Sequence, residues 1–165
     1  MAARGEDGDR VRLDEYIRSI TSSIVGMRAL VSRETSLAVD AVSVSIEPGR
    51  AIPLGLAAAE LVDNALRHAC PPEGGGSVRV DLTVDKGEAR LTVSDEGPGF
   101  PGDVDPDGCP TIGLTLVRLL AQQLGGRMHC DCTGGGTRIG VVFPVGEGTP
   151  PAPALPPLSH VRSFG

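Results

Sequence analysis

Aromatic residues are scarce in this 165-residue chain, which contains no Trp, one Tyr and three Phe. Hydrophobic residues still make up 40% of the sequence, so its apolar content is mainly aliphatic. This aliphatic share argues against wholesale disorder, and the 23 glycines show no period of three, which excludes a collagen-like chain. The length predicts one domain with enough residues to bury a core.

Long hydrophobic runs are also missing. No stretch of 18 apolar residues occurs, and the first ten residues, MAARGEDGDR, lack the apolar core of a secretory signal. We therefore expect a cytoplasmic protein without membrane contact. The four cysteines are then expected to be reduced thiols. No CxxC pair or spaced histidine pair completes a zinc site around Cys130 and Cys132.

An excess of basic residues is absent as well. Fifteen basic and 21 acidic residues give a net charge of −6, which argues against a nucleic-acid binder. The acidity is concentrated in one loop without basic residues, where five carboxylates occur: Asp95, Glu96, Asp103, Asp105 and Asp107.

The apolar periodicity predicts the order helix, strand, helix, two strands, loop, helix and two strands. Pro48-Gly49 is interpreted as a turn, and Pro53 as the start of the second helix. The helices are predicted at about 13–31, 53–69 and 112–124, and the strands at about 42–46, 78–84, 89–93, 127–133 and 137–143.

Strands joined by hairpins and interspersed with three helices predict an α+β fold. We expect a two-layer α/β sandwich with the helices on one face of a mainly antiparallel sheet. The domain is predicted over 11–145, after a polar linker at 1–10. The Pro-rich segment 146–165 has no periodicity and is predicted to be a disordered tail.

Polar side chains form a stripe on the helix predicted at 53–69. Glu60, Asn64, Arg67 and His68 recur at three- to four-residue steps, which places them on one face. A carboxylate, an amide and nitrogen donors in a row suit a hydrated divalent cation and phosphate oxygens. A solvated helix face is the alternative interpretation.

An aspartate followed by two close glycines ends the strand predicted at 89–93. The Asp95 carboxylate can accept a hydrogen bond from an amino-bearing base such as adenine, and Gly97 and Gly99 let a ligand approach the backbone. The alternative interpretation is a simple tight turn.

Two further segments could contact a nucleotide. Gly113 lies at the start of the third helix, between Ile112 and Leu114, where backbone N–H groups favour an anion. Thr137 follows three glycines at the start of the last strand, although hairpin turns commonly use Gly. The P-loop pattern GxxxxGK[ST] is absent, so a nucleotide would be held in another way.

Together, the four segments resemble the N, G1, G2 and G3 boxes of the GHKL ATPase superfamily. The similarity is greatest to the catalytic domain of bacterial sensor histidine kinases, particularly their HWE-like branch, and it covers about 11–144. RAIPLGLAAAE and RLDEYI are also similar to that branch. The boxes read, in order, ELVDNALRHA, SDEGPGFP, TIGLTLVRLLAQQLGG and GGGTRIGVVFP.

The resemblance implies a Bergerat-fold site for ATP and Mg²⁺. Asn64 would coordinate Mg²⁺, and Glu60 would act in catalysis by positioning or activating the group in line with the γ-phosphate. Arg67 and His68 would contact the phosphates.

The resemblance also implies how the base is bound. Asp95 would accept the adenine amine directly and through water, and Thr137 would join the same water network. Gly97 and Gly99 would shape the base pocket.

The ATP lid would run from Phe100 to Ile112, and Ile112, Gly113 and Leu114 would contact the nucleotide. The lid carboxylates either make binding strongly dependent on Mg²⁺ or lie on a solvated loop that points away from ATP.

This sequence departs from the family pattern in two ways. The lid is short, and Thr111 replaces the first glycine of many G2 boxes. The phosphoacceptor histidine is also missing, because none of His68, His129 and His160 lies in an acceptor helix.

We therefore expect the γ-phosphate to be donated to a histidine outside this chain. The acceptor would lie on a dimerisation domain, in cis or in trans, which would pass the phosphoryl group to a response regulator. The polar N-terminal segment resembles an interdomain linker, which favours a fragment of a longer kinase over a stand-alone protein.

Two alternatives remain at this stage. One is a stand-alone regulator resembling an anti-sigma factor serine kinase. The other is a nucleotide-binding interaction module without transfer activity.

Overall fold

The computed structural model describes residues 10–29, 35–69, 76–99, 112–131 and 135–146. The predictions for the linker before residue 10, the lid at 100–111, Cys132 and the tail after residue 146 lie outside these residues. The helices are α1 (Leu13–Ala29), α2 (Pro48–Ala69) and α3 (Ile112–Gln123). The strands are β1 (Val11–Arg12), β2 (Thr35–Ala41), β3 (Ser45–Ile46), β4 (Gly76–Asp85), β5 (Glu88–Asp95), β6 (Arg127–Asp131) and β7 (Thr137–Pro144).

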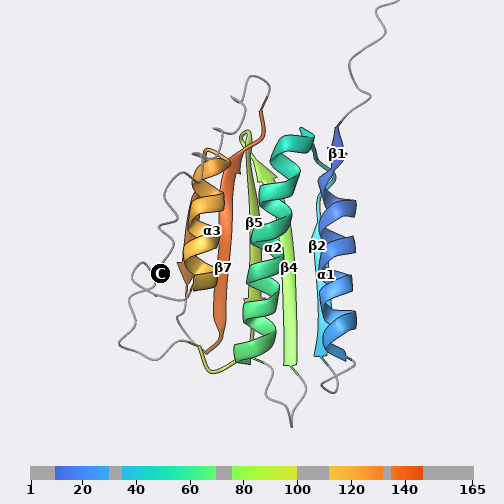
Figure 1. The fold of residues 1–165 in the computed structure, drawn as a ribbon, viewed down its shortest axis with the longest axis vertical. Coiled ribbons are helices and arrows are strands. Elements are labelled where there is room, and N and C mark those ends of the chain that lie inside the picture. The colour runs from blue at the N-terminus through green and yellow to red at the C-terminus, as the bar shows by residue number, and fades with distance from the viewer. Residues whose placement is uncertain (1–9, 30–34, 70–75, 100–111, 132–134, 147–165) are drawn as a thin grey trace, which may run out of the picture.

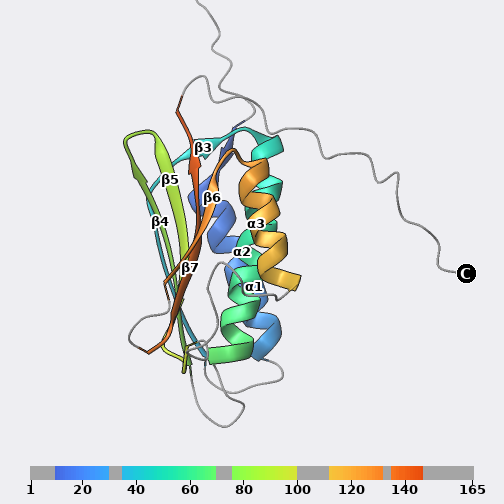
Figure 2. The same cartoon turned by 90° about the vertical axis from the view of Figure 1, so that its left-hand side faces the viewer.

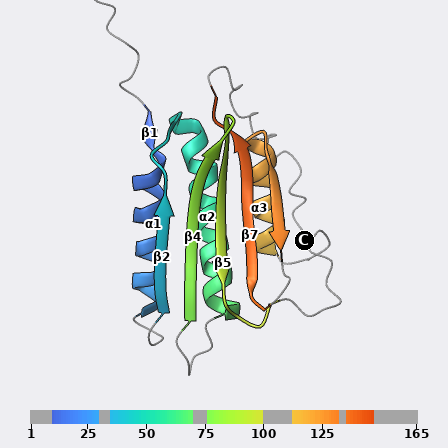
Figure 3. The ribbon, with the colours of Figure 1, turned by 180° about the vertical axis from the view of Figure 1, so that it is seen from behind.

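The main sheet has five strands in the order β2-β4-β5-β7-β6 (Figure 3). The β2–β4 pair is parallel, whereas the other three neighbouring pairs are antiparallel. All three helices lie on one face of this sheet (Figure 2). The predicted two-layer α+β sandwich with a mainly antiparallel sheet is therefore confirmed.

The predicted hairpin and the end of the third helix are confirmed in detail. Lys86 and Gly87 both have positive φ angles, 50° and 79°, as a type I′ turn requires. Gly125, with φ of 72°, ends α3. Its N–H donates to the Gln122 carbonyl, and that of Gly126 donates to the Ala121 carbonyl, both at 2.9 Å, which is a Schellman arrangement.

The prediction of a strand at 42–46 is wrong. The long strand in this region is β2, which pairs in parallel from Thr35 opposite Gly76 to Ala41 opposite Leu82. Ser45 and Ile46 instead pair with β1 in a separate two-stranded sheet. Short apolar alternation occurs in both segments, and the available partner strand decided which of them extends the main sheet.

The second helix begins five residues earlier than predicted. Pro48 occupies its first position, where a missing N–H costs nothing, and the Glu47 carbonyl accepts from the N–H groups of Arg50 and Ala51 at 3.0 and 3.2 Å. Pro53 lies inside the helix and leaves the Gly49 carbonyl without its usual donor. Gly49 is exposed, so water can satisfy this carbonyl and the helix continues.

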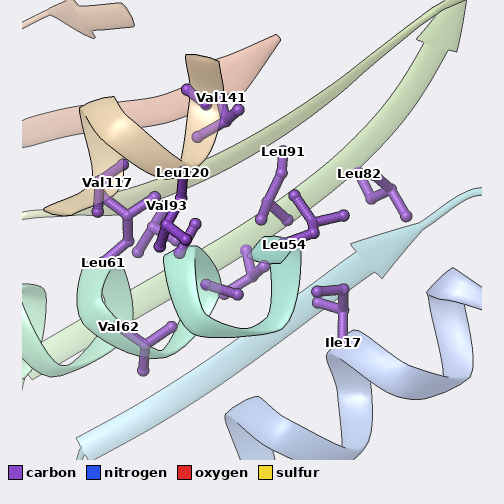
Figure 4. Packing of buried hydrophobic residues seen from close by; sticks show 14 of the residues in the cluster. Ile17, Leu54, Leu61, Val62, Leu82, Leu91, Val93, Val117, Leu120 and Val141 are labelled. Atoms are coloured by element: carbon purple, nitrogen blue, oxygen red, sulfur yellow. The ribbon is translucent and has the colours of Figure 1, made fainter. Parts of the chain in front are cut away.

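The core fills the space between the helices and the sheet (Figure 4). The predicted apolar face of α2 is buried there at Leu54, Ala58, Leu61 and Ala65. Residues from every long element join it, including Ile17 of α1, Leu91 and Val93 of β5, Val117 and Leu120 of α3, and Val141 of β7. Burial of these aliphatic side chains holds α2 and α3 against β5 and β7, the elements that carry the candidate site.

Some apolar side chains remain exposed on the helices. Met27 of α1 is 64% exposed, and Ile112 at the start of α3 is 90% exposed. In the described part of the chain, none of the helices combines the length and hydropathy needed to cross a membrane.

The helix-free face of the sheet carries a partly buried histidine. Thr92, Gly140 and His129 lie side by side on β5, β7 and β6. Because Gly140 has no side chain, the imidazole reaches across it, and the Nε2 of His129 lies 3.3 Å from the Thr92 hydroxyl. Burial lowers the pKa of His129 below 6.5, as do the nearby guanidinium groups of Arg90, Arg127 and Arg138.

We expect the stability of the fold to decrease as the pH falls below about 6.5. In the unfolded chain His129 gains a proton near that pH, whereas in the folded chain it stays neutral to a lower pH, so acid favours unfolding. Urea unfolding of wild type and His129→Gln at about pH 7.5 and 5.5 tests this prediction. The variant should lose less stability between the two pH values, and equal losses would contradict the assignment.

Candidate functional site

The C-terminal half of α2 forms one wall of a cavity of about 350 Å³. The predicted polar stripe lines this cavity together with the start of α3. The lining residues are Glu60, Asp63, Asn64, Arg67, His68, Ile112 and Gly113. The folded chain therefore brings six of the predicted site residues together, from two segments that lie more than 40 positions apart.

Gly113 allows α3 to begin directly against the Glu60 side chain. A Cβ atom at this glycine would lie 3.0 Å from Oε2 of Glu60, which is closer than ordinary packing allows. The next residue, Leu114, is only 2% exposed and its side chain belongs to the core. Its side chain therefore does not line the cavity.

The carboxylate of Asp95 lies at the end of β5, opposite Thr137 of β7. Its Oδ1 accepts hydrogen bonds from the backbone N–H groups of Gly97, at 3.0 Å, and Thr137, at 3.3 Å. Its Oδ2 accepts from the Thr137 hydroxyl. A carboxylate offers about four acceptor positions, and the contacts from the described residues use three of them, which leaves one for a further donor.

The turn after Asp95 packs against the start of β7. Gly99 has φ of 75°, and a Cβ there would lie 3.3 Å from the Gly136 carbonyl oxygen. Gly136 has φ of 109°, and a Cβ there would collide with the Asp95 carbonyl oxygen at 2.2 Å. Only glycine fits at Gly136, and its approach holds the strand end in place.

The predicted residues thus form two groups at the same end of the sandwich (Figure 1). Asp95 and Thr137 line a second cavity of about 180 Å³, together with Ser94, Asp131, Gly135, Gly136 and Arg138. The resemblance implied a shared water network for Asp95 and Thr137, and in the structure the hydroxyl contacts the carboxylate directly.

Two residues of this region were not predicted. Asp63 lines the first cavity and forms an ion pair with Arg67, four positions later on α2. This i,i+4 spacing was visible in the sequence. Arg28 of α1 contacts the other oxygen of Asp63, and no local sequence pattern connects these two residues.

The oxygen atoms of Asn64 and Glu60 in the first cavity are suitable ligands for a hydrated Mg²⁺ ion. The Asn64 amide oxygen and the Glu60 carboxylate are hard ligands, and Mg²⁺ keeps most of its waters, so one or two protein ligands are enough. The described residues contain no cluster of three or more His, Cys, Asp or Glu side chains placed to hold a metal.

Comparison with protein families shows the family to which this chain belongs. The family described as histidine kinase-, DNA gyrase B-, and HSP90-like ATPase matches residues 49–147, which is more than half of the chain. The chain belongs to this family of ATPases. Within the family, its relatives place it with the ATPase catalytic domains of sensor histidine kinases.

Two curated relatives are sensor kinases. The blue-light-activated histidine kinase 2 of Erythrobacter litoralis is 31% identical over 138 residues, covering 83% of this chain and 39% of that protein. The signal transduction histidine-protein kinase/phosphatase MprB of a Mycobacterium species is 32% identical over 143 residues, covering 71% of this chain and 27% of MprB. The chain thus spans well under half the length of either relative.

The solved structures that are similar to this chain also belong to sensor histidine kinases. The histidine kinase domain of the Erythrobacter litoralis EL346 blue-light-activated kinase superposes with a TM-score of 0.74 at 29% identity, covering 87% of this chain and 66% of that domain. The mycobacterial sensor histidine kinase MprB superposes with a TM-score of 0.64 at 25% identity, covering 82% of this chain and 97% of that structure.

Proposed function

We propose that this chain binds ATP with Mg²⁺ and donates the γ-phosphate to a histidine outside the chain. The observation that carries this proposal is the convergence of Asp95 and Thr137 with the Glu60–Asn64–Arg67 stripe at one end of the sandwich. Asp95 and Thr137 offer an acceptor for an amino-bearing base. The stripe on α2 offers oxygen ligands and cations for a phosphate chain.

In this proposal the adenine amine donates to the remaining acceptor position of Asp95. Thr137 holds the carboxylate in orientation through its hydroxyl and its N–H. Gly97 and Gly99 are assigned to shape the base pocket through the backbone, since the Gly97 N–H holds Asp95 and Gly99 lets the turn pack against Gly136. A guanine or hypoxanthine base presents a carbonyl where adenine has its amine, and this carbonyl would face the Asp95 carboxylate unfavourably.

The phosphates are assigned to the first cavity. Arg67 and His68 bind phosphate oxygens, and the backbone at Ile112, Gly113 and Leu114, where α3 begins, favours an anion. Asn64 holds Mg²⁺, which would neutralise part of the phosphate charge when bound. The lid at 100–111 is assigned to cover the nucleotide.

Glu60 is proposed as the catalytic residue. Its carboxylate lies next to the start of α3, where the terminal phosphate is expected, and can orient the incoming imidazole by accepting its N–H. The other imidazole nitrogen then attacks the γ-phosphorus, the bond between this phosphorus and the bridging oxygen breaks, and ADP leaves. Positioning and charge neutralisation supply most of the rate enhancement in such transfers.

The acceptor histidine is assigned to a helical dimerisation domain, in cis or in trans, and a response regulator is the onward recipient. The two histidines in the described part of the chain do not suit that role, since His68 lines the phosphate cavity and His129 is partly buried on the far face of the sheet. ATP is supplied in the cytoplasm, so we also place the reaction there.

Phosphotransfer with γ-labelled ATP tests the proposal. The chain alone should remain unlabelled, whereas a histidine-bearing helical domain mixed with it should gain an acid-labile, base-stable label. Asp95→Asn is the negative control. An acid-stable label would indicate a serine kinase instead, and ATP binding without transfer to any candidate acceptor would support the binding-module alternative.

A further inference from the structure

An arginine from α1 reaches the phosphate cavity indirectly. Nη2 of Arg28, in the last turn of α1, lies 2.5 Å from Oδ1 of Asp63. Oδ2 of the same carboxylate lies 2.7 Å from Nε of Arg67. One aspartate therefore bridges two guanidinium groups, and the second of these lines the cavity beside Glu60 and Asn64.

This bridge determines how Arg67 is held. The shortest contact of its guanidinium with Asp63 runs from Nε to Oδ2, while Oδ1 of the same carboxylate is held by Arg28. A guanidinium held through Nε can direct its Nη groups to an anion. If Oδ1 of Asp63 were released by Arg28, the carboxylate could accept two parallel hydrogen bonds from Arg67. Such a bidentate pair is stronger than the single contact and would hold the Nη group away from the cavity.

Charge acts in the same direction. With Arg28 in place, the three bridged groups carry a net charge of +1, next to the carboxylate of Glu60. Without Arg28, the Asp63–Arg67 pair is neutral, and the cavity attracts a phosphate chain less strongly.

We propose that Arg28 is a positioning residue for phosphate binding, which acts through Asp63 to keep Arg67 directed at the nucleotide. This inference rests on the proposed function, because it takes Arg67 to be a phosphate ligand. It also makes α1 part of the nucleotide site, although in the described structure no residue of α1 lines the cavity.

The helices α1 and α2 contact each other at two places along their length. Gly55 of α2 lies so close to Tyr16 of α1 that a Cβ atom there would come within 2.5 Å of the tyrosine hydroxyl oxygen. The two helices are thus closely packed in their N-terminal halves, while Arg28 joins them by a charged contact near the other end of α1.

The test is a double-mutant cycle with Arg28→Gln and Arg67→Gln, measured by calorimetry with Mg-ATP. Arg28→Gln should weaken ATP binding by about three- to tenfold and leave adenosine binding, followed by NMR titration, unchanged. In the Arg67→Gln background, Arg28→Gln should have a clearly smaller effect, because positioning passes through Arg67 and only the contribution of the Arg28 charge remains. Arg28→Lys, which keeps one charged donor, should recover part of the affinity.

Arg18→Gln is the matched control, because Arg18 is also on α1 but donates to the backbone carbonyls of Val39 and Ala41, away from the site. It should bind ATP as wild type does, and thermal melting should show that all variants are folded. Equal losses of ATP and adenosine binding, or additive losses in the cycle, would overturn the role of Arg28. A wild-type chain that fails to bind ATP would instead refute the proposed function itself.

Discussion

Asp95→Asn should lose at least about 100-fold of its affinity for ATP. The carboxylate accepts three hydrogen bonds from the protein and, in our proposal, a fourth from the adenine amine. An asparagine has only one oxygen with which to accept. Its NH₂ group could donate to the Thr137 hydroxyl, which also accepts, but it would then face the adenine amine, which is itself a donor. The loss is measured by calorimetric titration with Mg-ATP.

Two controls separate base recognition from a loss of folding. Asp81→Asn changes an aspartate on the neighbouring strand that pairs with Arg79 on the helix-free face, and it should bind ATP normally. Wild type should also bind inosine triphosphate about 100-fold more weakly than ATP, because hypoxanthine presents a carbonyl in place of the amine. Undiminished ATP binding by a folded Asp95→Asn would refute the adenine assignment.

Asn64→Ala should abolish most of the Mg²⁺ enhancement of ATP binding. Its amide oxygen is the proposed metal ligand, and the carboxylates of Glu60 and Asp63 in the same cavity disfavour an uncompensated tetra-anion. We expect the ratio of affinities with and without Mg²⁺ to fall by about tenfold or more. The measurement is a pair of calorimetric titrations with ATP, in Mg²⁺ and in EDTA.

Two control variants show whether the effect of Asn64→Ala is due to the loss of a metal ligand. Asn64→Asp retains an oxygen ligand and should keep its dependence on Mg²⁺. Gln122→Ala removes an exposed amide near the other end of α3 and should behave as wild type. If Asn64→Ala shows the full Mg²⁺ enhancement, the metal is held by other groups.

Local sequence patterns were sufficient to predict most of the helices and strands. The hairpin of β4 and β5 follows from strict alternation and a Lys-Gly turn, and α3 ends at Gly125 as a glycine pair predicts. The region between α1 and α2 was predicted incorrectly, because its pairing is nonlocal. β2 pairs with β4, and the whole of α2 lies between these two strands in the sequence. No pattern within 35–46 indicates which segment pairs with β4.

In the site, too, contacts within one helix could be predicted from the sequence, whereas contacts between distant segments could not. Glu60, Asn64, Arg67 and His68 share a face because helical geometry requires it, so their grouping was predictable. The Asp63–Arg67 pair has the same helical spacing and could have been found. The contact from Arg28 to Asp63 spans 35 residues and depends on how α1 packs on α2.

The sequence by itself was enough to predict the family, most of the element types and the polar side chains that line the first cavity, because these depend on periodicity, on side-chain chemistry and on short motifs. Only the tertiary structure decided that Thr137 holds Asp95 directly, that Gly113 lies against Glu60, and that Arg28 contacts Asp63. The physical reason is that burial of the aliphatic core, a nonlocal and nondirectional force, brings these segments together. Hydrogen bonds and ion pairs then select their partners from what the packing has placed within reach.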